Sequence, residues 1–396
     1  MAKNRHPPFN LGFRFGALDK DLKVLFLSNL VGSFGDGLYA YILPYYMTDA
    51  LKFSPVEIGT LYATTGLFSA MTLIVAGMLA DKYDRKKIMI AGWIAWLPAP
   101  LIFSYAENWL QMLPGMALWG VWLGGPTTTA YIITKAKKEK LTLTFTTISS
   151  SWSVGYIFSP ALGGYLARTI SMRIVFYSAF LLYGSASLLL FFVRSQYAKN
   201  LTQNVMEKPP SIFSMLKTRK IIVLSLFLGI TMFAVMLFRP FVPRFVADVY
   251  HYGDFEIGLL GSFSFFGSAV LGILLGKFGD KWRKSYALAS ALVLGASSLI
   301  LLLLFGDFYL LIITHFLIGA SYLAWPLMNA IIGPFAPESI RALWLAIPQT
   351  VGIFSLIVAP YLGGVLYEWS PYYPFVLGTV VAFFLALLTF SANFEG

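Results

Sequence analysis

The chain has few of the residues on which soluble enzymes depend. Its 396 residues include no cysteine and only three histidines, and charged residues make up 12%. Without cysteine there is no disulfide, no thiolate nucleophile and no Cys-ligated metal site. No Gly-x-x-x-x-Gly-Lys-Ser/Thr segment is present to bind ATP phosphates. These absences argue against an enzyme, a bound metal, a cofactor and an ATP-driven pump.

Hydrophobic residues dominate what is present. They make up 58% of the chain, and the mean hydropathy is +0.73, whereas an ordinary soluble domain carries roughly a quarter charged residues. Apolar segments follow one another from Leu22 to Phe390, which leaves no room for a soluble domain. The net charge of +11 comes from residues in short loops between these segments, so it indicates no nucleic-acid partner. The solvent of this chain is the lipid bilayer.

The apolar segments predict twelve membrane-spanning helices, each of about 20 residues or more. The fold class expected is therefore an all-α membrane protein. The predicted spans are Leu22 to Met47, Glu57 to Leu79, Ile88 to Tyr105, Leu110 to Ile133, Thr142 to Leu166, Arg173 to Val193, Ile221 to Val246, Glu256 to Gly276, Tyr286 to Phe305, Phe308 to Gly333, Ala342 to Leu366 and Tyr373 to Ala392.

The basic residues predict the orientation of the spans. Of the 29 Lys and Arg residues, 24 lie in the terminal segment and loops of one side, and only Lys52, Arg168 and Arg173 lie in the loops of the other. Short loops rich in Lys and Arg stay in the cytoplasm. We therefore expect a multi-pass protein of the cell membrane with both termini cytoplasmic.

An internal repeat divides the chain into two halves. Five regions match at an offset of 199 or 200 residues; for example, Glu57-Ile58-Gly59 matches Glu256-Ile257-Gly258. Each copy holds six spans, so both copies have the same orientation, as in parallel repeats. We expect a six-helix bundle in residues 1–193, a cytoplasmic linker in 194–220 that contains Pro209-Pro210, and a second bundle in 221–396.

A charged loop follows the second span and recurs after the eighth. The copies are Gly77-Met-Leu-Ala-Asp81-Lys82-Tyr-Asp84-Arg85-Lys86-Lys87 and Gly276-Lys-Phe-Gly-Asp280-Lys281-Trp-Arg283-Lys284. Glycine permits close helix contact, and a carboxylate among cations can favour one arrangement of the two halves. Both loops resemble the signature loop of the major facilitator superfamily. The resemblance implies a secondary transporter in which Asp81 latches against the start of the eleventh span, where Arg341 stands. Asp84 departs from the family pattern, which has glycine there.

The fifth span carries a second motif. Gly155-Tyr-Ile-Phe-Ser159-Pro160-Ala-Leu-Gly163-Gly164 resembles the antiporter motif of the drug-exporting branches of this family, although Ser159 replaces a glycine. The eleventh span ends in a similar copy, Pro360-Tyr-Leu-Gly363-Gly364. Two interpretations stay open: an antiporter element, or small residues that allow close helix packing in both halves. The fourth span lacks the arginine expected in many proton-coupled exporters.

Asp36 is the clearest candidate for chemistry inside the membrane. It lies between Gly35 and Gly37, about 14 residues or roughly 21 Å into the first span. A charged side chain at this depth costs about 2.5–3.5 kcal/mol, so it is a functional hypothesis by default. Burial disfavours the charged form, which would make proton uptake possible. The alternative is a structural carboxylate bound to neighbouring helices.

Other polar side chains in the spans are weaker candidates. Arg239, in Phe238-Arg239-Pro240, could pair with Asp36, bind an anionic substrate or extend toward the interface. His315 could titrate or be satisfied by packing. Asn329 and Gln349 could line a cavity or join helices by hydrogen bonds. Tyr39, like the other tyrosines that follow Asp36, could face a central cavity.

Together these features predict a secondary active transporter that works by alternating access. We expect proton-coupled export of an amphiphilic or hydrophobic compound by a monomer, with H⁺ as the coupling ion. An importer or uniporter of a sugar, organic acid or amino acid is the alternative within this class. A channel or lipid scramblase is the alternative class, and the duplicated gate loops argue against it.

Overall fold

The computed structural model describes residues 18–136, 141–197, 219–332, 335 and 341–391. All secondary structure in these residues is helical, and it forms twelve segments at the positions of the twelve predicted spans. Nine of the described segments are apolar and long enough to cross a membrane. The other three are the first, fourth and fifth, which supply Asp36, Trp119 and Tyr156 of the candidate site described below. The predicted all-α fold with twelve segments is confirmed.

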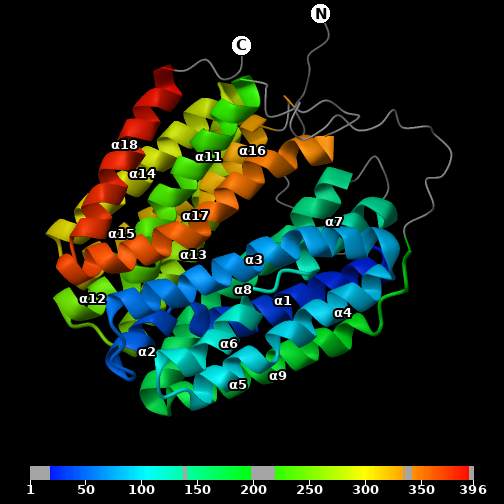
Figure 1. Cartoon of the computed structure of the whole chain (residues 1–396), viewed down its shortest axis with the longest axis horizontal. Coiled ribbons are helices and arrows are strands. Elements are labelled where there is room, and N and C mark those ends of the chain that lie inside the picture. The colour runs from blue at the N-terminus through cyan, green and yellow to red at the C-terminus, as the bar shows by residue number, and fades with distance from the viewer. Residues whose placement is uncertain (1–17, 137–140, 198–218, 333–334, 336–340, 392–396) are drawn as a thin grey trace, which may run out of the picture.

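The first six segments form one bundle, drawn from blue to green in Figure 1. Three of them are broken. Pro44 and Pro98 remove backbone hydrogen-bond donors in the first and third segments, and the fourth segment unwinds at residues 120–123. The elements are α1 (Lys20–Ala40) with α2 (Leu43–Asp49), α3 (Pro55–Lys82), α4 (Arg85–Trp96) with α5 (Pro98–Tyr105), α6 (Trp109–Trp119) with α7 (Gly124–Lys135), α8 (Leu141–Thr169) and α9 (Met172–Leu190).

The last six segments form a second bundle, in which the first and fourth segments are again broken. The seventh and tenth segments are each broken by a short 3₁₀ helix. The elements are α11 (Arg219–Phe238), η3 (Arg239–Phe241) and α12 (Val242–Tyr250), α13 (Asp254–Lys281), α14 (Lys284–Leu304), α15 (Phe308–Ile318), η4 (Gly319–Leu323) and α16 (Ala324–Ile332), α17 (Arg341–Trp369) and α18 (Tyr373–Ser391). Most of the predicted linker lies outside the described residues.

The two bundles meet through two helix pairs that the repeat relates to each other. α3 packs on α17, and α8 packs on α13. We call the side where α1 begins and α18 ends the terminal side, and the side where α2 and α12 end the far side. The bundles approach each other near α2 and α12 and diverge toward α7 and α16, on the terminal side (Figure 1).

Glycines of the repeated motifs bring these helices into backbone contact. A Cβ atom added to any of them would overlap a carbonyl oxygen of the neighbouring helix. Two contacts lie within the bundles, and four lie between them on the far side. Within the bundles, Gly163 meets Leu38 and Gly363 meets Leu237; between them, Gly164 meets Asp254, Gly364 meets Pro55, Gly258 meets Pro160 and Gly59 meets Pro360. Every contact has its repeat equivalent, so the far-side interface is pseudo-symmetric.

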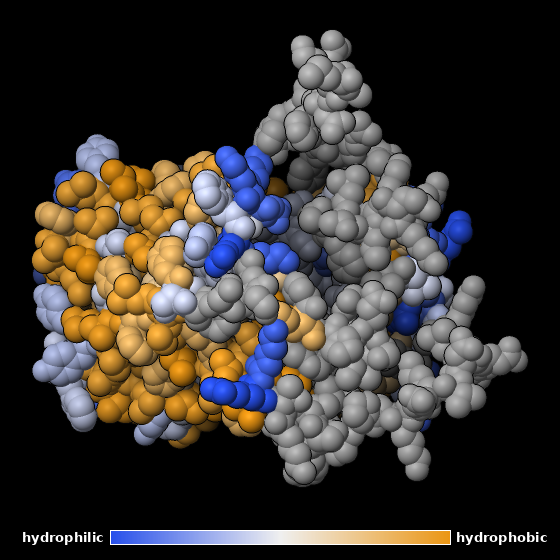
Figure 2. Space-filling model, turned by 90° about the horizontal axis from the view of Figure 1, so that it is seen from above, coloured by the Kyte–Doolittle hydropathy of each residue, from blue (hydrophilic) through white to orange (hydrophobic). Residues whose placement is uncertain are grey.

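The outer surface is apolar. Large hydrophobic side chains are exposed on helices of both bundles, for example Leu188, Leu387 and Tyr309, which are 64%, 68% and 77% exposed. Figure 2 shows one flank as mostly hydrophobic, with hydrophilic side chains gathered toward the middle of the view. Such a surface is stable only against lipid, because water would have to order around it. The chain is a multi-pass membrane protein.

Candidate functional site

Asp36 lies at the centre of an aromatic cluster in the first bundle. It is only 3% exposed, and its carboxylate accepts three hydrogen bonds. Trp119 Nε1 donates to Oδ1 over 2.7 Å, the Tyr183 hydroxyl donates to the same oxygen, and the Tyr156 hydroxyl donates to Oδ2. No cation within 4 Å of Asp36 is found among the described residues. The carboxylate is therefore held by neutral donors from α6, α8 and α9.

Small residues on α1 allow these donors to approach. A Cβ atom at Gly37 would overlap the Ser159 hydroxyl of α8, and one at Gly35 would lie 2.8 Å from Cβ of Leu182 on α9. Ser159, the residue that departs from the antiporter motif, therefore fits against a glycine that flanks Asp36. The close packing of α1 on α8 and α9 places the Tyr156 and Tyr183 hydroxyls at the carboxylate.

Tyr39 extends the cluster. Its ring is completely buried, and its hydroxyl lies 2.9 Å from the hydroxyl of Tyr183. Its ring packs against those of Trp119, Phe103 and Phe176 at centroid distances of 5.6–5.8 Å. Tyr39 therefore faces the interior of the first bundle and supports a donor of Asp36.

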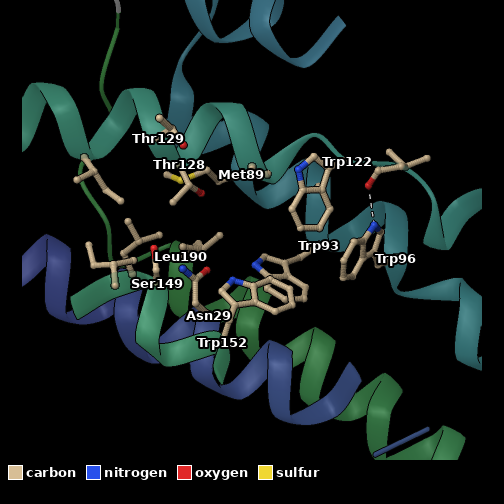
Figure 3. Close-up of a pocket in the computed structure, with 17 residues that line it drawn as sticks. Asn29, Met89, Trp93, Trp96, Trp122, Thr128, Thr129, Ser149, Trp152 and Leu190 are labelled. Atoms are coloured by element: carbon tan, nitrogen blue, oxygen red, sulfur yellow. Dashed lines mark hydrogen bonds between the residues drawn. The ribbon is translucent and has the colours of Figure 1, made fainter. Parts of the chain in front are cut away.

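A cavity of about 180 Å³ opens beside this cluster (Figure 3). It lies between α1, α4, α7, α8 and α9, and none of the described residues that line it is charged. Its polar groups include Asn29, Thr128, Thr129 and Ser149, and its walls include the indoles of Trp93, Trp96, Trp122 and Trp152. Aromatic walls with a few neutral polar groups suit a flat, amphiphilic ligand.

Two tryptophans that line the cavity contact the rings of the two tyrosines that donate to Asp36. The ring of Trp93 lies 5.6 Å from that of Tyr183, and the ring of Trp152 is stacked 6.2 Å from that of Tyr156. A ligand that displaced either indole would therefore press on a hydroxyl that binds the carboxylate.

Arg239 belongs to the second bundle, at the break of the seventh segment. Its guanidinium lies 4.0 Å from the ring centre of Tyr322, and no carboxylate lies within 4 Å of it among the described residues. Between Arg239 and Asp36 stand the rings of Tyr322, Phe265 and Tyr156, with successive centroid distances of 5.1 and 4.6 Å. In this conformation Arg239 does not pair with Asp36.

The remaining candidates do not contact Asp36. His315 is completely buried; its Nδ1 lies 2.8 Å from the Leu311 carbonyl, and its ring lies 6.4 Å from that of Tyr41. Asn329 and Gln349 bind each other over 3.1 Å, which joins α16 to α17. This pair acts between helices of the second bundle.

The first gate loop ties its own bundle together. Arg85 is buried, and it donates to the carbonyls of Ala80 and Ala130 and to the side chains of Thr134 and Gln196. Lys86 donates to the carbonyl of Phe191 over 2.6 Å. These cations therefore hold the ends of α3, α7 and α9.

Asp84, which stands where the family usually has glycine, caps α4. It accepts from the backbone N–H groups of Lys86 and Gln196 over 3.1 and 3.0 Å. The departure from the family pattern therefore stabilises the loop.

Among the described residues, neither motif glycine of the gate loops is packed against another helix. A Cβ atom at Gly77 or Gly276 would meet no described atom within 4 Å. In the second loop, Asp280 is exposed and Lys284 begins α14. The two cations between them lie near aromatic rings: Lys281 is 5.9 Å from the ring centre of Trp282, and Arg283 is 5.5 Å from that of Tyr286. The side chains of Asp81 and Arg341 lie outside the described residues, and their latch stays a prediction.

On the far side, polar contacts join the two bundles. Arg168 of α8 forms a 2.8 Å ion pair with Glu256 of α13. Arg244 of α12 donates to the carbonyl of Phe53 over 2.9 Å, and the Ala161 N–H donates to Ser262 over 3.0 Å. The far side is therefore closed.

Sequence reasoning did not identify the donors of Asp36. Trp119, Tyr156 and Tyr183 are 83, 120 and 147 residues away from it in the chain. Tyr156 lies inside the motif of the fifth span, so its position next to Gly155 was a usable signal. For Trp119 and Tyr183 no local pattern separates them from the other aromatic residues, which total 67.

Two repeated helical bundles that pack together on one side and enclose buried polar groups are the architecture of a membrane transporter. Residues 25–253 and 224–393 match the family model of the Major Facilitator Superfamily. The chain belongs to this superfamily, and it is a transporter rather than an enzyme. The family inferred from the gate loops is confirmed.

Individual relatives are multidrug resistance proteins. The chain is 30% identical over 271 residues to the multidrug resistance protein MdtG of Yersinia enterocolitica, a match that covers 66% of this chain and 65% of MdtG. It therefore spans just under two thirds of the length of this relative. It is 23% identical over 312 residues to the quinolone resistance protein NorA of Staphylococcus aureus, with 77% of this chain and 79% of NorA covered.

Solved structures of the same fold are more distant in sequence. The nucleoside transporter NupG superposes with a TM-score of 0.77 at 14% identity over 95% of this chain and 100% of NupG. A bacterial homologue of the human lysosomal transporter Spinster, in an inward-facing and occupied conformation, gives a TM-score of 0.71 at 14% identity, with coverage of 93% and 95%. At this identity the likeness shows the fold alone.

Proposed function

We propose that this transporter exports an amphiphilic or hydrophobic compound in exchange for protons, and that Asp36 carries the proton. The observation that carries the proposal is a buried carboxylate bound by three aromatic donors with no described cation beside it. The aromatic cavity next to it supports an amphiphilic substrate. The relatives named for multidrug and quinolone resistance support export.

Protonation of Asp36 would change its hydrogen bonds. The ionised carboxylate can accept from Trp119, Tyr156 and Tyr183 together, and these bonds replace the water that it loses on burial. A protonated carboxyl group must donate its own proton to an acceptor, so one of the two tyrosine hydroxyls has to turn. Because Tyr156 lies on α8, which packs on α13 of the other bundle, this change would reach the interface between the halves.

A ligand in the cavity and the ionised form of Asp36 would compete, because both depend on the positions of the Tyr183 and Tyr156 rings. A ligand between Trp93 and Trp152 presses on Tyr183 and Tyr156, whose hydroxyls hold the ionised carboxylate. Binding of the ligand would then favour one protonation state, and proton uptake would favour release of the ligand. Such reciprocity is the requirement for exchange transport.

The orientation of the chain completes the proposal. With both termini in the cytoplasm, as the distribution of basic residues predicts, the terminal side faces the cytoplasm. The conformation described above is then the inward-facing one, in which substrate enters from inside the cell.

The experiment measures transport by the purified protein in liposomes with a pH gradient, acidic inside. Fluorescent probes of different charge are used because the natural substrate is unknown: rhodamine 6G is cationic, Nile red is neutral and 1-pyrenebutyrate is anionic. Wild-type protein should concentrate at least one probe against its gradient, and pyranine inside the liposomes should report proton efflux on its addition.

The Asp36→Asn variant separates coupling from binding. Asparagine fixes a neutral side chain, so accumulation should vanish while exchange of probe without a pH gradient continues. Asp307→Asn is the matched control, because Asp307 is exposed and only caps α15, a role that asparagine fulfils. Gradient-driven accumulation by the Asp36→Asn variant would refute the proton-carrier role and leave a facilitator or a coupling site such as His315.

A further inference from the structure

Arg239 has a position that its own bundle does not explain. It is half-buried at membrane depth, where a guanidinium is costly unless it has a counter-charge or a function. Arg244, five residues further on, binds Asp248 over 3.1 Å and the carbonyl of Phe53 over 2.9 Å. Within the described part of the chain, Arg239 has neither an acidic partner nor a hydrogen-bond acceptor, and its guanidinium lies over the ring of Tyr322.

Two further polar groups, on the neighbouring rings of Tyr41 and His315, are unsatisfied. The hydroxyl of Tyr41 is buried and finds no hydrogen-bond partner among the described residues, and the same holds for Nε2 of His315. Tyr41 belongs to the first bundle, and its ring packs on both His315 and Phe265 of the second. Unpaired buried polar groups are rare in native proteins, and their gathering in one place calls for a ligand.

We propose that Arg239 and Tyr41 form a binding site for the anionic group of an aromatic substrate, a carboxylate on a ring system. This inference rests on the proposed transport function and names the chemistry of its substrate. The guanidinium lies over the Tyr322 ring, which leaves its in-plane N–H donors free for a carboxylate. The hydroxyl of Tyr41 supplies another donor from the opposite bundle.

The surrounding rings define the rest of the ligand. Tyr322, Phe265 and Tyr156 stand in sequence from Arg239 toward Asp36, and each can stack on an aromatic body. His315 contributes no donor when neutral, because Nδ1 must donate to the Leu311 carbonyl and Nε2 then carries a lone pair. The site therefore selects an anion through Arg239 and Tyr41.

The experiment compares three probes that differ only in their terminal group. Binding of 1-pyrenebutyrate, 1-pyrenebutyramide and 1-pyrenebutylamine to the full chain is measured in neutral detergent by energy transfer from tryptophan. The wild-type protein should bind the carboxylate about 10-fold or more tightly than the amide, the ratio that one charge-assisted hydrogen bond supports.

Substitutions then identify the residues that cause the preference for the carboxylate over the amide. Arg239→Gln should abolish it and leave the affinity for the amide within about 3-fold, and Tyr41→Phe should reduce it. Arg239→Lys should retain part of it through the charge alone. Arg244→Gln is the matched control, since this arginine lies on the same segment and is already paired, and it should keep the full preference.

Three results would overturn the inference: equal binding of carboxylate and amide by the wild type, a preference that survives Arg239→Gln, or an equal loss in Arg244→Gln. The result is independent of the proton-carrier role, because equilibrium binding needs no gradient. Asp36→Asn should keep the carboxylate preference even where it abolishes accumulation, so the two proposals fail separately.

Discussion

Gly258 tests whether backbone contact on the far side holds this conformation. A Cβ atom at this position of α13 would overlap the carbonyl oxygen of Pro160 on α8. Gly258→Ala should therefore force the bundles apart on the far side and shift the protein toward the other conformation. Gly184→Ala is the matched control, because it lies within α9 of the first bundle, away from the gate loops, and its Cβ would meet only Cδ1 of Leu97 among the described atoms, at an ordinary contact distance of 3.8 Å. Both substitutions gain the same helix propensity of about 1 kcal/mol, which cancels in the comparison.

The size of the effect follows from the overlap. Extra methyl groups in a well-packed interface cost about 1–3 kcal/mol. Acting on the closed conformation alone, this cost changes the ratio of the two conformations by a factor of about 5–150. The helices could relieve part of the overlap by a small shift, which would place the result near the lower bound.

A single introduced cysteine reports the opening, since the chain has none of its own. Ser262 is 7% exposed and accepts the N–H of Ala161 across the interface, so a thiol at this position is protected while the far side is closed. In Ser262→Cys protein, maleimide labelling should be faster with Gly258→Ala by the factor above and unchanged within about 2-fold with Gly184→Ala. Equal labelling rates in the two variants would show that the glycine contact does not hold the closed state.

Three further predictions concern the orientation, the gate and the first bundle. Tags at residues 1 and 396 should resist an external protease in intact cells, and cleavage of either would reverse the orientation. Asp81→Asn should slow turnover and keep ligand affinity within a few fold, with a weaker effect for Asp280→Asn; a collapse of affinity with unchanged accessibility would refute the latch. Arg85→Gln should lower the thermal unfolding midpoint by several degrees, because it removes hydrogen bonds to four acceptors, whereas exposed Lys281→Gln should not. Equal midpoints would contradict the structural role of Arg85.

The repeat made the arrangement of the bundles predictable. The match of Glu57-Ile58-Gly59 to Glu256-Ile257-Gly258 required equivalent helices, and the structure places both glycines against proline carbonyls of the opposite bundle. The small residues of the fifth and eleventh spans were similarly readable, because only glycine permits contact between backbones. Asp36 was identified because a carboxylate in an apolar span has a high free-energy cost and is therefore rare without a function.

The surroundings of Asp36 could not be predicted in the same way. Hydropathy treats every Tyr and Trp of a span alike, whereas only the packing of α1 on α8 and α9 decides which hydroxyls reach the carboxylate. The same limit applied to Arg239, for which pairing with Asp36 and binding an anion were equally open. Only the structure shows that three rings stand between the two charges in this conformation.

The sequence by itself determined the membrane location, the twelve spans, the twofold repeat and the family, because these follow from periodicity and from the cost of placing charge in lipid. The tertiary structure decided which residues form the site and which side of the two bundles is closed. Those properties depend on contacts between segments more than 80 residues apart, such as Trp119 with Asp36 and Arg168 with Glu256. No local pattern in the chain encodes these pairs, since each forms only when the helices pack.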